Sequence, residues 1–302
     1  MRLHSLSTFL YSLLLLLTTA AAHPLHAQSA PTPPVPDAPP EPATPTAKGK
    51  AVPLGPAEPL ALHQRRADLP TLWIAGDSTA AKGAPAATGW GVPFAALADA
   101  KAINVVNGAR GGRSSRTFVT EGLWEKMAAE IKKGDFVIIQ FGHNDAGPLN
   151  DASRARGSIR TIGEETETIQ NLVTKKEETV HTYGWYFRKM ITDTKARGAT
   201  PIVLSLTVRN EWKDGKVERR NGPWNALAKA TAESTQTRFI DLTAALADAY
   251  DKLGAEAVKP FFPKDHTHTG PEGAAFTARL LTEILQPLAI PGLPQTTSAP
   301  TP

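Results

Sequence analysis

The chain has 302 residues, of which 41% are hydrophobic and 21% charged, a composition typical of a globular protein with a sizeable core. It contains no cysteine, which excludes disulfide bonds, thiolate nucleophiles and cysteine-bound metal centres. The net charge is +4, from 33 basic and 29 acidic residues, and the sequence lacks the dense basic stripe of a nucleic-acid-binding protein. Any nucleophile must therefore be an oxygen or a lysine.

Residues 1–27 have the layout of a secretory signal peptide. Arg2 precedes an apolar run at residues 9–17, which is too short to span a bilayer comfortably, and small residues follow it. A charged start, an apolar core and a small-residue cleavage region are the parts of a signal peptide. We expect cleavage after Ala22 or after Ala27 and a secreted or periplasmic protein, with an uncleaved anchor as the alternative.

Proline-rich segments flank the body of the chain. Residues 28–68 are crowded with proline, alanine and threonine, a composition that cannot build a packed core and behaves as an extended tether. Residues 290–302 have a similar composition. We therefore expect one folded domain at residues 69–289, with disordered segments on both sides.

The expected domain alternates between short apolar runs and segments with helical spacing. The apolar runs predict strands at residues 72–75, 103–106, 135–141, 201–206 and 239–242. Apolar residues at helical spacing predict helices at residues 90–100, 123–131, 183–197, 223–235, 243–253 and 271–285. This alternation is typical of a mostly parallel sheet covered by helices on both faces. Residues 147–182 interrupt it with a polar segment of the kind that is usually functional or disordered.

Polar residues follow each of the first three predicted strands. They are residues 76–79 (GDST), 107–113 (NGARGGR) and 142–145 (GHND). A fourth polar group, residues 265–268 (DHTH), lies in a loop before the last predicted helix. Because ligands bind beyond the carboxyl ends of parallel strands, we expect the four groups to meet at one edge of the sheet.

Ser78 is the candidate nucleophile. A serine hydroxyl is weak until a base removes its proton, and the base needs an acidic partner that orients it. His266 and His268 are the candidate bases. Asp265 and His268 are three residues apart, a spacing at which side chains in one helical turn face the same side. We therefore expect Ser78, His268 and Asp265 to form a catalytic triad, with His266 as a substrate contact.

The same loops offer donors for an oxyanion hole. Acyl transfer builds negative charge on an oxygen, and a donor that is preorganised toward it is commonly worth about 3 to 4 kcal/mol. We expect the backbone N–H groups of Ser78 and Gly112 and the Asn144 carboxamide to supply these donors, since glycine permits a close approach. Taken singly, such short motifs are more often helix caps or turns, so the prediction depends on their coincidence.

These residues also carry a resemblance to a known family. Residues 76–78, Gly112, residues 142–145 and the Asp265-x-x-His268 pair match, in order, the four sequence blocks of the SGNH branch of the GDSL hydrolases. The rhamnogalacturonan acetylesterases within that branch resemble the chain at residues 75–80 (AGDSTA), 89–91 (GWG), 112–116 (GRSSR), 141–145 (FGHND) and 262–269 (FPKDHTHT). The resemblance covers most of residues 72–285.

The resemblance implies a three-layer α/β/α, flavodoxin-like fold with a central parallel five-stranded sheet. It assigns Ser78, Asp265 and His268 as the triad and Ser78, Gly112 and Asn144 as the oxyanion hole, in agreement with the chemistry above. It also implies that the enzyme removes acetyl groups from rhamnogalacturonan, a pectic polysaccharide, without a metal or other cofactor. We expect a monomer that binds neither nucleic acid nor, beyond the signal sequence, a membrane.

Other candidate substrate contacts surround this site. Arg113 and Arg116 flank the oxyanion loop, and planar guanidinium groups suit the carboxylates of galacturonate. Roles as surface arginines, or as a brace of the loop for Arg113, are equally consistent with the sequence. Trp90 is a candidate for stacking on a sugar ring, although tryptophans are more often core residues.

Three alternatives remain open. A metal-dependent hydrolase would use carboxylates and imidazoles drawn from Asp77, His143, Asp145, Asp265, His266 and His268. That chemistry leaves Ser78 and Gly112 without a role. A carbohydrate-binding module that kept the fold has no need of a nucleophile and a base. A generic acyl esterase or an acetylxylan esterase would use the same triad on another ester.

Overall fold

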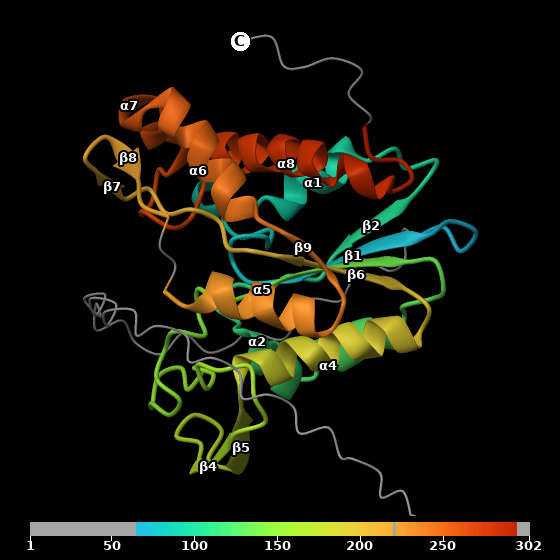
Figure 1. The fold of residues 1–302 in the computed structure, drawn as a ribbon, viewed down its shortest axis with the longest axis vertical. Helices are drawn as coiled ribbons and strands as arrows, with labels where there is room; N and C mark the ends of the chain where they lie inside the picture. The colour runs from blue at the N-terminus through green and yellow to red at the C-terminus, as the bar shows by residue number, and fades with distance from the viewer. Residues whose placement is uncertain (1–64, 220–221, 295–302) are drawn as a thin grey trace, which may run out of the picture. The chain divides into compact units, whose positions relative to one another are not determined.

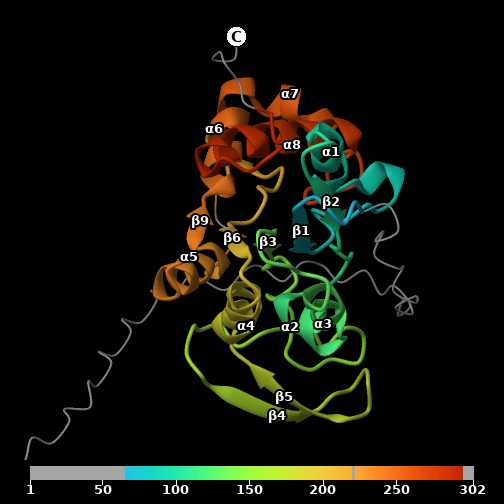
Figure 2. The same ribbon diagram turned by 90° about the vertical axis from the view of Figure 1, so that its right-hand side faces the viewer.

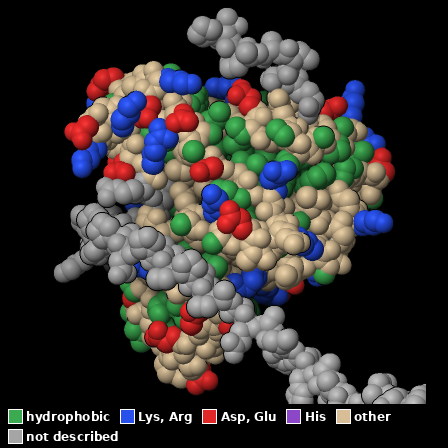
Figure 3. Space-filling model, viewed as in Figure 1, with side chains coloured by type: hydrophobic (Ala, Val, Ile, Leu, Met, Phe, Trp, Pro, Cys, Tyr) green, Lys and Arg blue, Asp and Glu red, His purple; other side chains and the backbone are tan. Residues whose placement is uncertain are grey.

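The computed structural model describes residues 65–219 and 222–294. The predicted signal peptide, nearly all of the predicted tether and residues 295–302 lie outside the described residues. Among the helices of the described part, none is long and apolar enough to cross a membrane. Basic and acidic side chains are interspersed on the face shown in Figure 3, in keeping with the small net charge.

A five-stranded parallel sheet with the order β2-β1-β3-β6-β9 lies at the centre of the fold (Figure 1). Its strands are β1 (Thr71–Gly76), β2 (Asn104–Asn107), β3 (Phe136–Gln140), β6 (Thr200–Leu204) and β9 (Arg238–Ile240). Numbered along the chain, this order is the 2-1-3-4-5 arrangement of flavodoxin-like folds. The predicted parallel five-stranded sheet is confirmed.

Helices cover both faces of the sheet (Figure 2). One layer contains α1 (Gly91–Leu97), α6 (Leu242–Leu253), α7 (Ala255–Val258) and α8 (Pro271–Leu285). The other contains α2 (Ser115–Thr120), α3 (Leu123–Ala128), α4 (Tyr183–Ala196) and α5 (Trp224–Ser234). Successive β1 residues point to opposite layers, because Leu72 and Ile74 belong to one core cluster and Trp73 and Ala75 to the other.

Several short elements were not predicted. The polar segment at residues 147–182 contains an antiparallel hairpin of β4 (Thr166–Gln170) and β5 (Glu177–His181). A smaller hairpin joins β7 (Trp212–Lys213) to β8 (Lys216–Val217). Helix α2 begins at a capping box in which the side chains of Ser114 and Thr117 satisfy each other's backbone N–H groups.

The packed chain extends past the predicted boundary at residue 289. Ile290 and Leu293 are buried in the core cluster that contains α1 and α8. The backbone oxygen of Gly292 accepts a hydrogen bond from the N–H of Asp99 at 2.8 Å. The prediction of a disordered tail is therefore wrong for residues 290–293, where two apolar side chains complete the core.

Candidate active site

Ser78 lies in a tight turn directly after β1. The backbone oxygen of Asp77 accepts hydrogen bonds from the N–H groups of Ala80 and Ala81 at 3.3 and 3.0 Å. The Asp77 side chain is fully buried and accepts from the N–H and the hydroxyl of Thr79 at 2.9 and 2.8 Å. Burial raises the pKa of this carboxyl. Asp77 therefore holds the turn that presents Ser78.

Ser78, His268 and Asp265 form a continuous chain of polar contacts. Ser78 Oγ lies 2.9 Å from His268 Nε2. His268 Nδ1 lies 2.8 Å from Asp265 Oδ2. Burial by itself would raise the pKa of Asp265, but hydrogen bonds from the His268 backbone and ring and from the Thr267 backbone outweigh it, so the pKa is lowered. An ionised carboxylate thus lies beside the imidazole, in the order that the sequence predicts.

The loop that carries His268 is docked on the N-terminal part of the domain. The Thr269 hydroxyl donates to the backbone oxygen of Thr88 at 2.9 Å, which ties the loop to the segment before α1. Asp265 also accepts the backbone N–H of His268 at 2.8 Å. These bonds bring His268 to Ser78, 190 residues earlier in the chain.

Gly112 and Asn144 lie in the loops that follow β2 and β3. A Cβ added to Gly111 would lie 3.9 Å from the Cβ of Ser78, so the first of these loops adjoins the Ser78 turn. Gly112 has a φ of +75°, which favours glycine. The Asn144 side chain joins the two loops, because its Nδ2 donates to the backbone oxygen of Arg113 at 2.8 Å. The loops that carry the predicted donors therefore lie next to one another, and the oxyanion hole itself stays a prediction.

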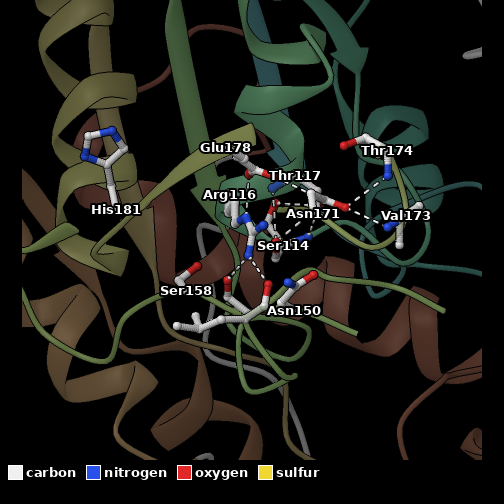
Figure 4. Close-up of polar contacts among 12 residues, drawn as sticks. Ser114, Arg116, Thr117, Asn150, Ser158, Asn171, Val173, Thr174, Glu178 and His181 are labelled. Carbon is white, nitrogen blue, oxygen red and sulfur yellow. Dashed lines mark hydrogen bonds and ion pairs between the residues drawn. The ribbon is translucent and has the colours of Figure 1, made fainter. Parts of the chain in front are cut away.

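Arg116 is a brace inside the protein (Figure 4). Its side chain is 0% exposed, and its Nε donates to Glu178 Oε1 at 2.7 Å. Its Nη1 donates to the backbone oxygens of Leu149 and Gly157 at 2.7 and 2.8 Å. The prediction that Arg116 contacts substrate is wrong, because the side chain is sequestered where it holds α2 to the segment after residue 147.

Two further predicted contacts are also engaged within the protein. Arg113 donates from Nε to Glu121 Oε2 and from Nη1 to the backbone oxygen of Gly111, both at 2.9 Å, so it braces the loop that follows β2. Trp90 is 1% exposed and donates from Nε1 to Gln140 Oε1 at 2.8 Å. Trp90 is therefore a core residue and cannot stack on a sugar.

Asp145 and His143, from the GHND motif, contact other residues than the Ser78–His268–Asp265 chain. Asp145 is fully buried and accepts hydrogen bonds from the hydroxyls of Ser115 and Ser158. Burial raises its pKa to about 6 despite these bonds. His143 contacts Thr207 Oγ1 through Nε2 at 3.2 Å, and burial of the ring lowers its pKa to about 3. Within residues 65–219 and 222–294, no three His, Asp or Glu side chains are grouped so that they could hold a metal ion.

Two polar side chains lie at the edge of the site. The His266 side chain is 43% exposed, with Nε2 at 3.5 Å from Glu211 Oε1, and its substrate contact stays a prediction. Arg156, which was not predicted, donates from Nη1 to the backbone oxygen of Gly112 at 3.2 Å. The sequence shows several arginines in the polar segment at residues 147–182, but their spacing does not indicate which of them reaches Gly112.

A doubly wound α/β domain with a serine after its first strand and a histidine before its last helix defines a class of serine ester hydrolases. Residues 74–276 match the GDSL-like Lipase/Acylhydrolase family, and the chain belongs to this family. The predicted family and the predicted class of enzyme are confirmed.

Known proteins similar to the chain include esterases of this family. A rhamnogalacturonan acetylesterase from Emericella nidulans is 34% identical over 208 residues, which are 69% of this chain and 81% of the relative. The rhamnogalacturonan acetylesterase RhgT from Bacillus subtilis is 29% identical over 238 residues, 73% of this chain and 91% of the relative. The solved structure of YxiM from Bacillus subtilis is similar with a TM-score of 0.60 and 25% identity; the match covers 74% of this chain and 58% of that one.

Proposed function

We propose that the chain is a secreted carbohydrate esterase that removes acetyl groups from rhamnogalacturonan through a Ser-His-Asp acyl-enzyme mechanism. The observation that carries the proposal is the 2.9 Å distance between Ser78 Oγ and His268 Nε2, with Asp265 at the other ring nitrogen. The names of the two rhamnogalacturonan acetylesterase relatives support the substrate. The charge and apolar pattern of residues 1–27 supports secretion.

Ser78 is the nucleophile in the first half-reaction. Its Oγ attacks the carbonyl carbon of the acetyl ester while its proton passes to His268 Nε2. Asp265 keeps the other ring nitrogen protonated and stabilises the imidazolium that forms. His268 then gives the proton to the sugar oxygen as the ester C–O bond breaks. The acetyl group remains on Ser78, and the deacetylated sugar leaves.

Water regenerates the enzyme in the second half-reaction. His268 removes a proton from a water molecule, whose oxygen attacks the acetyl carbonyl. The bond to Ser78 Oγ breaks, the serine recovers its proton from His268, and acetate is released. The lowered pKa of Asp265 keeps its carboxylate ionised throughout both half-reactions. The proton transfers of the cycle therefore need only these three side chains, the sugar oxygen and water.

The oxyanion hole stabilises the negative charge that develops on the carbonyl oxygen in both half-reactions. The proposed donors are the N–H groups of Ser78 and Gly112 and the carboxamide of Asn144. A carboxamide nitrogen carries two hydrogens, so Asn144 can hold the backbone oxygen of Arg113 with one and donate the other to the oxyanion. Braced donors of this kind need no reorganisation when the charge appears.

Acetate release from acetylated rhamnogalacturonan, acetylated xylan and an aryl acetate tests this proposal, with Ser78→Ala as the control. We expect the highest kcat/KM on acetylated rhamnogalacturonan and no comparable release by Ser78→Ala. Release from xylan or from the aryl ester alone would reject the substrate in favour of an acetylxylan esterase or a generic esterase. Activity that survives Ser78→Ala but not a chelator would favour the metal-dependent alternative, and polysaccharide binding without acetate release would favour the binding module.

A further inference from the structure

Arg156 lies beside both loops that carry the proposed oxyanion donors. Its Nη1 donates to the backbone oxygen of Gly112 at 3.2 Å. A Cβ added to Gly147 would lie 3.4 Å from Arg156 Cγ, and the Gly147 N–H donates to the backbone oxygen of Asn144 at 3.2 Å. The Arg156 side chain therefore packs against the Gly112 loop and the Asn144 loop together.

The guanidinium of Arg156 lacks the ion pair that its neighbours have. Arg113 pairs with Glu121 and Arg116 pairs with Glu178, whereas Arg156 has no carboxylate at ion-pair distance among the residues that the structure describes. Burial lowers the pKa of Arg156 to about 10, so the group is still cationic at neutral pH. Asp77, Asp145 and Asp151 favour the charged form from a distance without forming an ion pair. A guanidinium has five N–H donors, and the bond to Gly112 uses one of them, so the others can bind an anionic ligand.

The backbone around Arg156 is fixed on both sides. Ala155 is buried with a φ of +36°, a left-handed conformation that is strained for a residue other than glycine. Gly157 is held at its N–H by the backbone oxygen of Pro148 at 2.9 Å and at its oxygen by Arg116 Nη1 at 2.8 Å. Such strain collects at ligand-binding positions, where the surrounding structure keeps it in place.

We propose that Arg156 binds the carboxylate of an acidic sugar next to the acetylated residue and so determines the preference for acidic over neutral acetylated polysaccharides. This inference rests on the proposed function. A guanidinium offers two parallel N–H donors that fit a carboxylate, and Arg156 keeps such donors beside the oxyanion loop. Arg113 and Arg116 cannot take this role, because each is already engaged with a glutamate of the protein.

The test compares acetylated rhamnogalacturonan with the same polymer after its galacturonate carboxylates are reduced to neutral alcohols. We expect the wild type to favour the acidic polymer by about tenfold or more in kcat/KM, which is the effect of one charge-assisted hydrogen bond. Arg156→Gln should bring this ratio close to one, mainly by raising KM for the acidic polymer, and Arg156→Lys should keep part of it. Arg154→Gln removes the same charge from an exposed position of the same segment and should behave as the wild type.

Two outcomes of this comparison would overturn the inference. One is a wild-type ratio near one, and the other is an Arg156→Gln variant that loses kcat/KM equally on both polymers, as expected if Arg156 only braces the Gly112 loop. A second measurement does not require cleavage of a pectic polymer. It is the inhibition of aryl acetate hydrolysis by unacetylated oligogalacturonate. We expect the inhibition constant to rise about tenfold in Arg156→Gln. If the wild type cleaves the aryl ester but no pectic polymer, the proposed function fails, whereas an unchanged inhibition constant would overturn the role of Arg156.

Discussion

The loop at residues 265–268 and the loop at residues 142–145 each contain an aspartate, but the two carboxylates differ in burial and in their partners. The Asp265 side chain is 35% exposed and faces the His268 ring, and its pKa is lowered. Asp145 is fully buried against two serine hydroxyls, and its pKa is raised to about 6. The partly exposed Asp265 is therefore suited to orienting a base, whereas the buried Asp145 holds chain segments together.

The largest expected effect on activity comes from removing Ser78 or His268, the two side chains that form the proposed triad with Asp265. Ser78→Ala and His268→Ala should each lower kcat/KM for acetyl esters by about four orders of magnitude or more, because the parts of a triad act as one unit. Far-ultraviolet circular dichroism and the urea midpoint should stay close to those of the wild type. A rate within about tenfold of wild type in either variant would contradict the proposed triad.

Exchanging each carboxylate for an amide separates the two roles. Asp265→Asn should lower kcat by about 10³- to 10⁴-fold, since an amide cannot stabilise the imidazolium, while the free energy of unfolding changes little. Asp145→Asn should instead lower the free energy of unfolding by about 1 to 3 kcal/mol, because it keeps an oxygen for the two serine hydroxyls but places an NH2 group where Oδ2 accepts from the buried Ser115 N–H. Steady-state kinetics and urea unfolding of both variants measure the difference. A loss of kcat in Asp145→Asn as steep as in Asp265→Asn would erase the distinction.

Asn144, next to Asp145 in the chain, should show an intermediate effect on turnover. Asn144→Ala removes one oxyanion donor and should lower kcat by about 10²- to 10³-fold, with a smaller change in KM. Unfolding measured on the same sample reports separately on the lost hydrogen bond to Arg113. If kcat stayed near the wild-type value, Asn144 would not belong to the oxyanion hole.

The smallest expected effect is a pH dependence of stability. The pKa of Asp145 is raised from its ordinary value of 3.8 to about 6 in the folded protein, so the stability from this carboxyl is fully present below pH 3.8 and is lost as the pH rises through 6. The lowered pKa of Asp265 acts in the opposite direction, with stability lost as the pH falls. The wild type should therefore gain free energy of unfolding relative to Asp145→Asn between pH 7.5 and pH 4. A gap that did not change with pH would show that Asp145 titrates as it does in the unfolded chain.

The sheet could be predicted from the sequence, whereas the β4–β5 hairpin could not. Buried parallel strands are continuous apolar runs, as in Phe136–Gln140, and such runs stand out from their surroundings. In the hairpin only Ile169 and Val180 are buried, so both strands lack the alternation that predicts a half-buried strand. Helix α2 was missed because a single short turn closed by Ser114 and Thr117 has no apolar period.

The contacts among Ser78, His268 and Asp265 could be predicted because strand ends and a three-residue spacing can be read directly from the sequence. The solvent exposure of a side chain cannot be read in this way. Trp90, Arg113 and Arg116 were expected to face substrate, but their polar groups bond to Gln140, Glu121 and Glu178, which no sequence pattern pairs with them. The same ambiguity hid Arg156, whose approach to Gly112 depends on how the segment after residue 147 folds back.

The 190-residue separation between Ser78 and His268 has a consequence for biosynthesis. Ser78 is synthesised early and His268 late, so under the proposed mechanism a polypeptide that stops before residue 268 lacks the base that activates the serine. On that mechanism, hydrolysis begins only after the loop before α8 has docked on the backbone oxygen of Thr88. The time at which ester cleavage begins during refolding would therefore report when the last part of the domain has folded.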